Sequence, residues 1–544
     1  MLLVGPPGCG KTTLARAIAK DCGIDFLDCS AARWQMAGYL NDHLTAMSRD
    51  FQEARRFAPT IMFIDEIDSV GNRDTFSGSN AVYATQVVNA LLAELQGFAD
   101  REKVFVIAAT NSLENVDPAL PRAGRLDRVI EVKLPTIDAL EKISGAAIYG
   151  DDIDFGASLL YAELVSSTQA HAIIKSIDTS AAEKVPGVYK VFTGKDFPYK
   201  FGLYMKDRYV FAQDKVRFVG EQIAAVVGRT PQAAKQGAAL VKVEYEPLPA
   251  VLDQMEALRD DATLLHPELG DYPHVPWFFP KAGTNIAHWR KTRKGDLEAG
   301  FAQSELILED TYTVPRYAHC AIETHVAIGK LDYSGRLTVW SSSQSPHTQR
   351  HLFAEALGKS HKDVRVIAPH VGGGFGGKAG VTMEIIPAAL ATKLKGYAVK
   401  LRYSREQEFI NTYQRLGVVA KIKMGINKDG RICALDHKIY WDAGAYVEYG
   451  ANVVNAVGLS AIGPYKIDNL SIDSVCVYTN LPPGGAYRGF GYSEMLFGLE
   501  SHITRAAHQL GIDEVEFRRL NAIKAGDLTA YGAKMNPNGL HESI

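Results

Sequence analysis

Val371-Gly-Gly-Gly-Phe-Gly-Gly-Lys378 is a glycine-rich stretch in which Phe375 is the only large side chain inside the loop. Glycines leave no side chain between the backbone and a ligand, so N–H groups can approach a flat or anionic group closely. Apolar residues 364–369 before it predict a strand, and residues 383–394 after it predict a helix. The stretch therefore predicts a ligand-binding turn between a strand and a helix, although glycine runs also form simple tight turns.

A second glycine-flanked loop, Gly484-Gly-Ala-Tyr-Arg-Gly-Phe-Gly491, presents Arg488 and Phe490. A forked guanidinium can bind an oxyanion or oxo group, and a phenyl ring can stack on a flat substrate. Two further polar side chains stand at the ends of apolar segments, Glu323 and Gln344. Glu323 fits either a carboxylate that hydrogen-bonds a substrate or a structural carboxylate in a salt bridge.

The first quarter of the chain carries a different glycine loop, Gly5-Pro-Pro-Gly-Cys-Gly-Lys-Thr12. It fits the spacing G-x-x-x-x-G-K-[ST] and lies between an expected buried strand, residues 1–4, and an expected helix, residues 13–20. Backbone N–H groups of such a loop bind phosphates, and its lysine reaches the β and γ oxygens. We expect the ATP-binding residues to be Gly5, Gly8, Gly10, Lys11, Thr12 and Thr13.

Polar residues end the next two expected strands of this quarter. Residues 60–64 lead into Asp65 and Glu66, and residues 104–110 lead into Asn111. After a phosphate-binding loop, Asp65 together with Thr12 is expected to hold Mg²⁺, and Glu66 is expected to act as the general base on water.

Together these motifs resemble the AAA ATPase family over residues 1–135. The resemblance implies that Asn111 orients the attacking water and that Arg125 and Arg128 act in trans on a neighbour's γ-phosphate, which requires self-association. Arg125 and Arg128 also fit a solvated surface pair. Two parts that family members carry are not found here: the segment before the first strand that holds adenine, and the helical lid.

From about residue 145 to residue 544, the four motifs described above resemble the molybdenum-cofactor-binding large subunit of the xanthine dehydrogenase and aldehyde oxidase family. The resemblance implies that Glu323 and Phe490 face the substrate. It also implies hydroxylation of an aldehyde or an aromatic or N-heterocyclic substrate with water, and electron transfer to an iron–sulfur small subunit and an FAD medium subunit. By the same resemblance, the molybdenum-pterin cofactor is bound by Gln344, Gly374, Phe375, Gly376, Ala486 and Arg488.

The expected fold is multidomain, α/β and α+β. Residues 1–143 form an AAA core, a parallel sheet with flanking helices but without the lid, and residues 144–259 form an a/b hammerhead domain. Residues 260–294 are an irregular connection along the surface, and residues 295–544 are the first part of a molybdopterin-binding domain. By resemblance, the catalytic glutamate of the family lies beyond Ile544.

Two positions bear on the substrate. Gly489 follows Arg488, where carbon monoxide dehydrogenases of the family carry cysteine, and Ala456 stands where purine-oxidising members carry arginine. The sequence thus argues against carbon monoxide and leaves an aldehyde, an N-heterocycle or an aromatic thioester open.

Composition excludes several classes of protein. The 544 residues are 47% hydrophobic and 22% charged with a net charge of −3, which excludes a disordered chain and gives no electrostatic argument for nucleic acid. No apolar run reaches membrane-spanning length and no signal peptide is recognisable, so a cytoplasmic protein is expected. The six cysteines are scattered, which argues against an iron–sulfur cluster within the chain. Two alternatives remain: an ATP-driven assembly factor or scaffold with a docking fragment, and a chimeric chain without activity.

Overall fold

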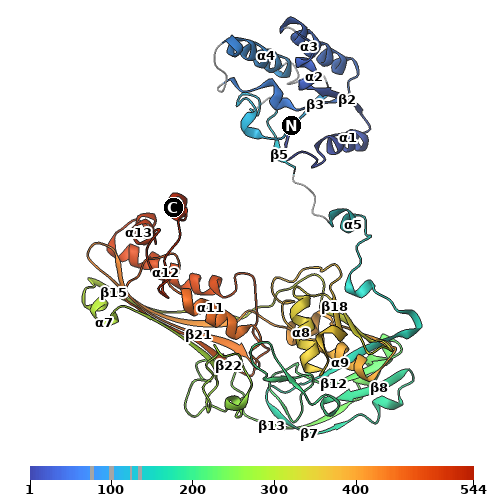
Figure 1. Cartoon of the computed structure of the whole chain (residues 1–544), viewed down its shortest axis with the longest axis vertical. Coiled ribbons are helices and arrows are strands. Elements are labelled where there is room, and N and C mark those ends of the chain that lie inside the picture. The colour runs from blue at the N-terminus through green and yellow to red at the C-terminus, as the bar shows by residue number, and fades with distance from the viewer. Residues whose placement is uncertain (39, 74–78, 97–102, 123–124, 133–137) are drawn as a thin grey trace. The chain divides into compact units, whose positions relative to one another are not determined.

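The computed structural model describes the chain except for residues 39, 74–78, 97–102, 123–124 and 133–137 (Figure 1). The chain divides into two compact units, Met1–Ala147 and Ile148–Ile544, called here the first and second unit. Pro135, where the resemblance to AAA ATPases ends, lies outside the described residues. In the part that the structure describes, no helix is long and apolar enough to cross a membrane.

A five-stranded, fully parallel sheet organises the first unit, in the order β2-β3-β4-β1-β5. Its strands are β1 (Leu2–Val4), β2 (Asp25–Ser30), β3 (Thr60–Asp65), β4 (Val104–Thr110) and β5 (Val129–Glu131). Its helices are α1 (Lys11–Cys22), α2 (Ala31–Gln35), α3 (Leu40–Arg56), α4 (Ser79–Gln96) and α5 (Ala139–Ile143). The central strands are apolar on both faces: Leu2 and Met62 belong to one core with residues of α3 and α4, and Leu3 and Phe63 belong to another with residues of α1.

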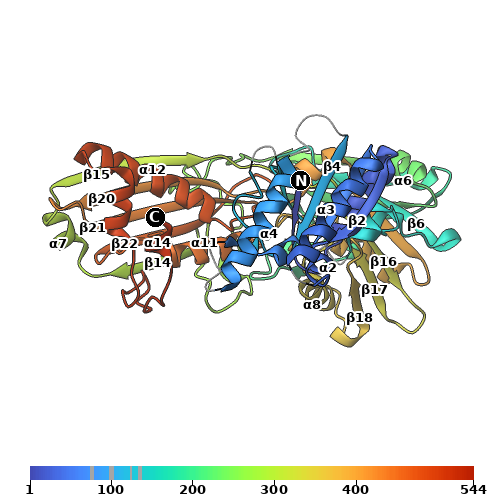
Figure 2. The same ribbon diagram turned by 90° about the horizontal axis from the view of Figure 1, so that it is seen from above.

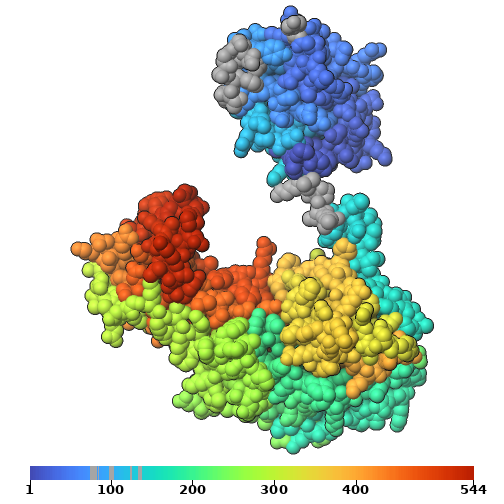
Figure 3. Space-filling view, in the orientation of Figure 1, coloured from blue at the N-terminus to red at the C-terminus, as the bar shows by residue number. Residues whose placement is uncertain are grey.

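The second unit contains a seven-stranded mixed sheet in the order β18-β17-β16-β19-β6-β12-β8. Its strands are β6 (Leu159–Ser166), β8 (Val188–Thr193), β12 (Gln222–Gly228), β16 (Val326–Leu331), β17 (Leu337–Ser341), β18 (Val364–Ile367) and β19 (Ala398–Arg402). Strands β6 and β19 pair in parallel, so one sheet joins the expected hammerhead region to the region that follows it. In the space-filling view, the green and yellow residues of these regions form a continuous surface (Figure 3).

The second unit also contains smaller sheets and several helices. One three-stranded sheet has the order β11-β7-β13, and β9 pairs with β10. These elements are β7 (Ala172–Asp178), β9 (Lys200–Phe201), β10 (Arg208–Tyr209), β11 (Lys215–Val216), β13 (Lys242–Pro247), α6 (Pro231–Ala238), α8 (Pro346–Ala356), α9 (Ile385–Lys393) and α10 (Arg405–Asn411). The glycine loop lies between β18 and α9, which confirms the expected strand-loop-helix order.

Five long strands form the other sheet of the second unit, in the order β14-β22-β21-β20-β15. They are β14 (Ile286–Lys294), β15 (Leu306–Val314), β20 (Gly417–Ile426), β21 (Ile432–Gly444) and β22 (Leu470–Tyr478). The accompanying helices are α7 (Leu297–Ala302), α11 (Gly450–Ser460), α12 (Tyr492–Leu510), α13 (Glu514–Asn521) and α14 (Leu540–Ser543). Helices α11 and α12 pack against this sheet, as the second view shows (Figure 2).

The expectation of an irregular surface connection over residues 260–294 is wrong in part. Its last nine residues form strand β14, which pairs with β22 at the edge of the five-stranded sheet. Earlier residues of the segment, Leu265, Leu269 and Phe278, are buried in the core of that sheet. Prolines and histidines made the segment look like a surface loop, whereas its apolar residues anchor it inside the unit.

Candidate functional site

Three loops of the second unit meet at the glycine-rich stretch. The backbone N–H of Gly376 donates to Oε1 of Gln344 over 2.9 Å, and the N–H of Gln344 donates to the carbonyl oxygen of Lys378, also over 2.9 Å. The N–H of Arg488 donates to the carbonyl oxygen of Phe375 over 2.8 Å. These bonds link the loop after β17, the glycine loop and the loop before α12 into one surface.

The contacts between these loops are too close for side chains at two glycines. A Cβ atom at Gly374 would lie 2.4 Å from Oε1 of Gln344, and one at Gly376 would lie 2.5 Å from the carbonyl oxygen of Ala486. Gly376 also has φ of +104°, a left-handed conformation that L side chains rarely adopt. The six residues expected to bind the cofactor thus lie on three neighbouring loops, and glycine is required by sterics at position 376, where the close atom is backbone.

Both aromatic residues expected at the site have left-handed backbones. Phe375 has φ of 51° and Phe490 has φ of 47°. A non-glycine residue in this region costs about 1 to 3 kcal/mol, and such residues cluster at functional sites. Phe375 is 47% exposed although its loop is tightly held, so its ring is available to an approaching ligand.

Glu323 makes the salt bridge that its sequence context allowed. Its Oε2 accepts from Nζ of Lys378 over 2.6 Å and from the N–H of Gly372 over 2.9 Å, so this oxygen is structural. Its Oε1 is buried and has no hydrogen-bond partner among the described residues. A buried carboxylate oxygen without a partner is costly.

A buried histidine supports the glycine loop from beneath. His325 Nδ1 lies 2.8 Å from Oε1 of Glu408, and its Nε2 lies 3.2 Å from the carbonyl oxygen of Gly377. Burial acts to lower the pKa of His325, but the Glu408 carboxylate outweighs it and raises the pKa above its usual value. Nδ1 and Nε2 of His325 thus face these two oxygens, and the ring links Glu408 to the glycine loop. Within the described ranges, no group of three or more His, Cys, Asp or Glu could hold a metal ion.

Arg415 is a positioning residue that the sequence motifs did not reveal. Its Nη2 donates to the carbonyl oxygen of Arg488 over 2.6 Å, and its Nη1 lies 2.5 Å from Oε1 of Glu494. Its guanidinium also lies 4.0 Å from the ring centre of Tyr487. Because Arg415 stands in no motif and its partners are distant in sequence, only a structure could assign it to the Arg488 loop.

In the first unit, the predicted phosphate loop lies between β1 and α1. Nζ of Lys11 donates to Oδ1 of Asn111 over 2.9 Å and to the carbonyl oxygen of Gly5 over 2.7 Å. The hydroxyl of Thr12 donates to Oδ2 of Asp65 over 3.5 Å. Glu66 follows with φ of 52°. The ends of β1, β3 and β4 therefore gather the expected ATP and Mg²⁺ residues in one place.

Three predicted residues of the first unit lie apart from this group. Nη1 of Arg125 donates to the carbonyl oxygen of Ala119, and the carbonyl oxygen of Arg128 accepts from Leu2 at the start of β1. The side chain of Arg125 is thus held, and the backbone of Arg128 pairs with the start of β1, whereas the phosphate loop follows the end of that strand. Thr13 is exposed on the first turn of α1.

Three family models match the chain in sequence order. Residues 1–134 match the ATPase family associated with various cellular activities (AAA). Residues 144–249 match the aldehyde oxidase and xanthine dehydrogenase a/b hammerhead domain. Residues 278–522 match the molybdopterin cofactor-binding domain, which contains the three loops described above.

The chain is 34% identical over 411 residues to the nicotinate dehydrogenase large molybdopterin subunit of Eubacterium barkeri, covering 75% of this chain and 93% of that one. It belongs to the molybdenum hydroxylase large-subunit family of xanthine and nicotinate dehydrogenases. Another member of the family, the xanthine dehydrogenase molybdenum-binding subunit of Escherichia coli O157:H7, is 32% identical over 75% of this chain, which spans 54% of that relative.

Solved structures of molybdenum hydroxylases have the same fold. The aldehyde oxidoreductase of Desulfovibrio gigas matches with a TM-score of 0.69 and 29% identity, over 75% of this chain and 45% of that one. Quinoline 2-oxidoreductase of Pseudomonas putida 86 matches with a TM-score of 0.66 and 27% identity, over 75% of this chain and 52% of that one. The mixed α/β architecture of the second unit is therefore that of a molybdenum-binding subunit.

The residues present fit a molybdenum-pterin cofactor. The N–H groups of Gly372, Gly376 and Gly377 donate within the site, and the close packing at Gly374 and Gly376 holds Gln344 and Ala486 against the loop. Because Gly376 binds the side-chain oxygen of Gln344, the NH₂ group of Gln344 serves as the donor. The unpartnered Oε1 of Glu323 provides a buried acceptor beside Gly372. This donor and acceptor set suits a flat polar group.

Proposed function

We propose that the second unit binds a molybdenum-pterin cofactor and a small substrate, and hydroxylates an aldehyde or an aromatic or N-heterocyclic compound with water. The observation that carries the proposal is the meeting of Gln344, the glycine loop and Arg488 through backbone hydrogen bonds. Iron–sulfur and FAD subunits as electron acceptors, a cytoplasmic location, and the domain limits 1–143, 144–259, 260–294 and 295–544 belong to the same proposal.

Each residue of the site has a separate task in this proposal. Gln344 has its side-chain oxygen held by Gly376, so its NH₂ group points its donors toward the cofactor. The ring of Phe375 lines the cofactor site, the ring of Phe490 stacks on a flat substrate, and Oε1 of Glu323 accepts a hydrogen bond from that substrate. The bound cofactor supplies the oxidation chemistry, while these side chains orient the substrate and exclude water.

Metal and pterin analysis of the full-length gene product tests this function. We expect molybdenum and a pterin to co-purify with the protein, and dye reduction to depend on an aldehyde or a heterocycle. A fully folded product that carries neither molybdenum nor pterin after expression in a host that makes the cofactor would contradict the proposal.

A second activity, ATP binding and hydrolysis by the first unit, is favoured by the contacts of Lys11. Its ammonium group is held by the carbonyl oxygen of Gly5 and by Asn111, oxygens that a phosphate can replace. We propose that Thr12 and Asp65 hold Mg²⁺ in a P-loop AAA core, that Glu66 is the base, and that Arg125 and Arg128 serve a neighbouring subunit. This activity would also suit an ATP-driven assembly factor.

Replacing Lys11 by alanine is expected to weaken binding of a fluorescent ATP analogue about a hundredfold, because the lysine provides the charge that pairs with the β and γ phosphates. Lys20→Ala is the matched control, since Lys20 is exposed in the last turn of the same helix α1. Equal affinity of the two variants, measured by fluorescence anisotropy, would argue against nucleotide binding at this loop.

A further inference from the structure

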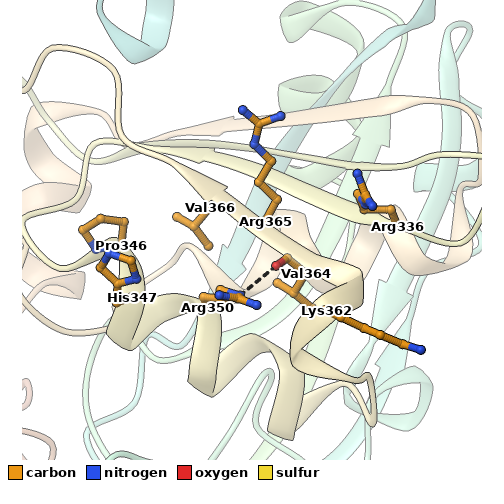
Figure 4. Close-up of a pocket in the computed structure, with 8 residues that line it drawn as sticks. All are labelled: Arg336, Pro346, His347, Arg350, Lys362, Val364, Arg365 and Val366. Carbon is orange, nitrogen blue, oxygen red and sulfur yellow. Dashed lines mark hydrogen bonds between the residues drawn. The ribbon is translucent and has the colours of Figure 1, made fainter.

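A groove lined with basic side chains follows the outer edge of β18, and none of the residues expected to bind the cofactor lines it (Figure 4). One wall is the first turns of α8, with Pro346, His347 and Arg350, and the other is β18 itself, with Val364, Arg365 and Val366. Arg336 and Lys362 complete the lining, which contains no carboxylate. The groove is therefore strongly positive in a protein whose net charge is −3.

The charges in the groove are not neutralised. In the described part of the chain, no ion pair involves Arg336, Lys362 or Arg365, and all three side chains are exposed. Arg350 uses its guanidinium to donate to the carbonyl oxygens of His361 and Val364. Like charges gathered in a concave surface repel one another and raise the local concentration of anions.

The backbone at this edge is also open to a partner. Strand β18 is the outermost strand of the seven-stranded sheet, with only β17 beside it. The carbonyl oxygen of Val364 already accepts from Nε of Arg350, so a partner strand would pair with the other backbone groups of this edge. An extended peptide can pair with such an edge through its own backbone.

The arrangement of the charges favours an extended ligand over a compact one. His347 lies toward one end of the groove, Arg336 and Lys362 lie toward the other, and Arg350 lies between them (Figure 4). The parallel register of Leu337 with Val364 likewise puts Arg336 beside the start of β18. A single phosphate would contact one part of this row, whereas an extended chain can contact its whole length.

We propose that this groove binds an extended acidic segment of a partner polypeptide, which adds to the sheet as a strand beside β18. Its carboxylates pair with the arginines and Lys362, and its backbone pairs with the open edge. The inference is independent of the chemistry proposed above for the cofactor loops.

The test uses the full chain and a fluorescent octapeptide of alternating glutamate and valine. We expect binding by fluorescence anisotropy that weakens with added salt, and about a tenfold or greater loss in the double variant Arg336→Glu with Arg365→Glu. The matched control, Lys195→Glu with Lys428→Glu, makes the same change in net charge at exposed lysines outside the groove and should bind as the parent does.

A second probe separates strand addition from charge attraction alone. The same peptide with alternate backbone nitrogens methylated keeps its carboxylates but cannot pair along one edge, and we expect it to bind at least about tenfold more weakly. Equal binding of the methylated peptide, equal loss in the control variant, or no binding at low salt would each overturn the proposal. If the basic residues serve only to keep this edge from pairing with a second copy of itself, the peptide would show no binding at low salt.

Discussion

Replacing Gly376 by alanine is expected to remove most of the bound molybdenum and to lower the rate of substrate oxidation about a hundredfold or more. The added Cβ would lie 2.5 Å from the carbonyl oxygen of Ala486, and φ of +104° is unfavourable for alanine. That carbonyl oxygen also lies 2.8 Å from Nε2 of His319, so a shift of the Ala486 loop would break this hydrogen bond. Metal analysis and dye reduction measure the two effects.

Gly283→Ala provides the control for backbone strain. Gly283 has φ of +73°, but a Cβ atom there would meet no heavy atom within 4 Å. This variant should lose about 1 kcal/mol of stability and keep its molybdenum and its activity. If Gly376→Ala also kept both, close packing between the glycine loop and Ala486 would not be required for cofactor binding.

Local patterns in the sequence predicted the cofactor loops well. Strand, glycine loop and helix occur in the expected order from β18 to α9, because apolar periodicity and glycines are properties of neighbouring residues. The meeting of Gln344, Gly376 and Arg488 followed from family resemblance, since nothing local indicates that three separate loops share hydrogen bonds.

Pairings between distant strands were not predictable in the same way. Strand β6 pairs with β19 to make one sheet from two expected regions, and β14 pairs with β22 although its surroundings look irregular. Such pairings depend on which edges are free once the chain has folded. For the same reason the support of the Arg488 loop by Arg415 and Glu494 was missed.

The structure shows the salt-bridge role of Glu323, whereas its substrate-facing role stays a prediction. Salt-bridge geometry depends on where Lys378 points, and the burial of one carboxylate oxygen depends on how the glycine loop packs. The sequence identifies only the residue type. Oε1 and Oε2 of Glu323 differ in the partners that the fold brings to each oxygen.

Variants of Glu323 and Lys378 can distinguish a structural role of Glu323 from a substrate-binding role. Glu323→Gln leaves Lys378, whose side chain is 1% exposed, without its carboxylate. An unpaired buried charge of this kind costs about 3 to 5 kcal/mol, so thermal unfolding should shift to clearly lower temperature. Activity would fall as well, but this single variant cannot say whether through the fold or through the substrate.

The double variant Glu323→Gln with Lys378→Met separates these causes, because it removes both charges and leaves no unpaired cation. We expect most of the stability and the bound molybdenum to return. Activity should remain low, about tenfold or more below the parent in kcat/KM, because the one amide oxygen accepts from the N–H of Gly372 and the NH₂ group, a donor, takes the place of Oε1. Lys378→Met alone retains the carboxylate, whose Oε2 still accepts from Gly372, and should therefore keep more activity than the double variant. Recovery of full activity in the double variant would assign Glu323 to the support of the loop alone, whereas recovery of stability without activity would make Oε1 a direct contact of the substrate.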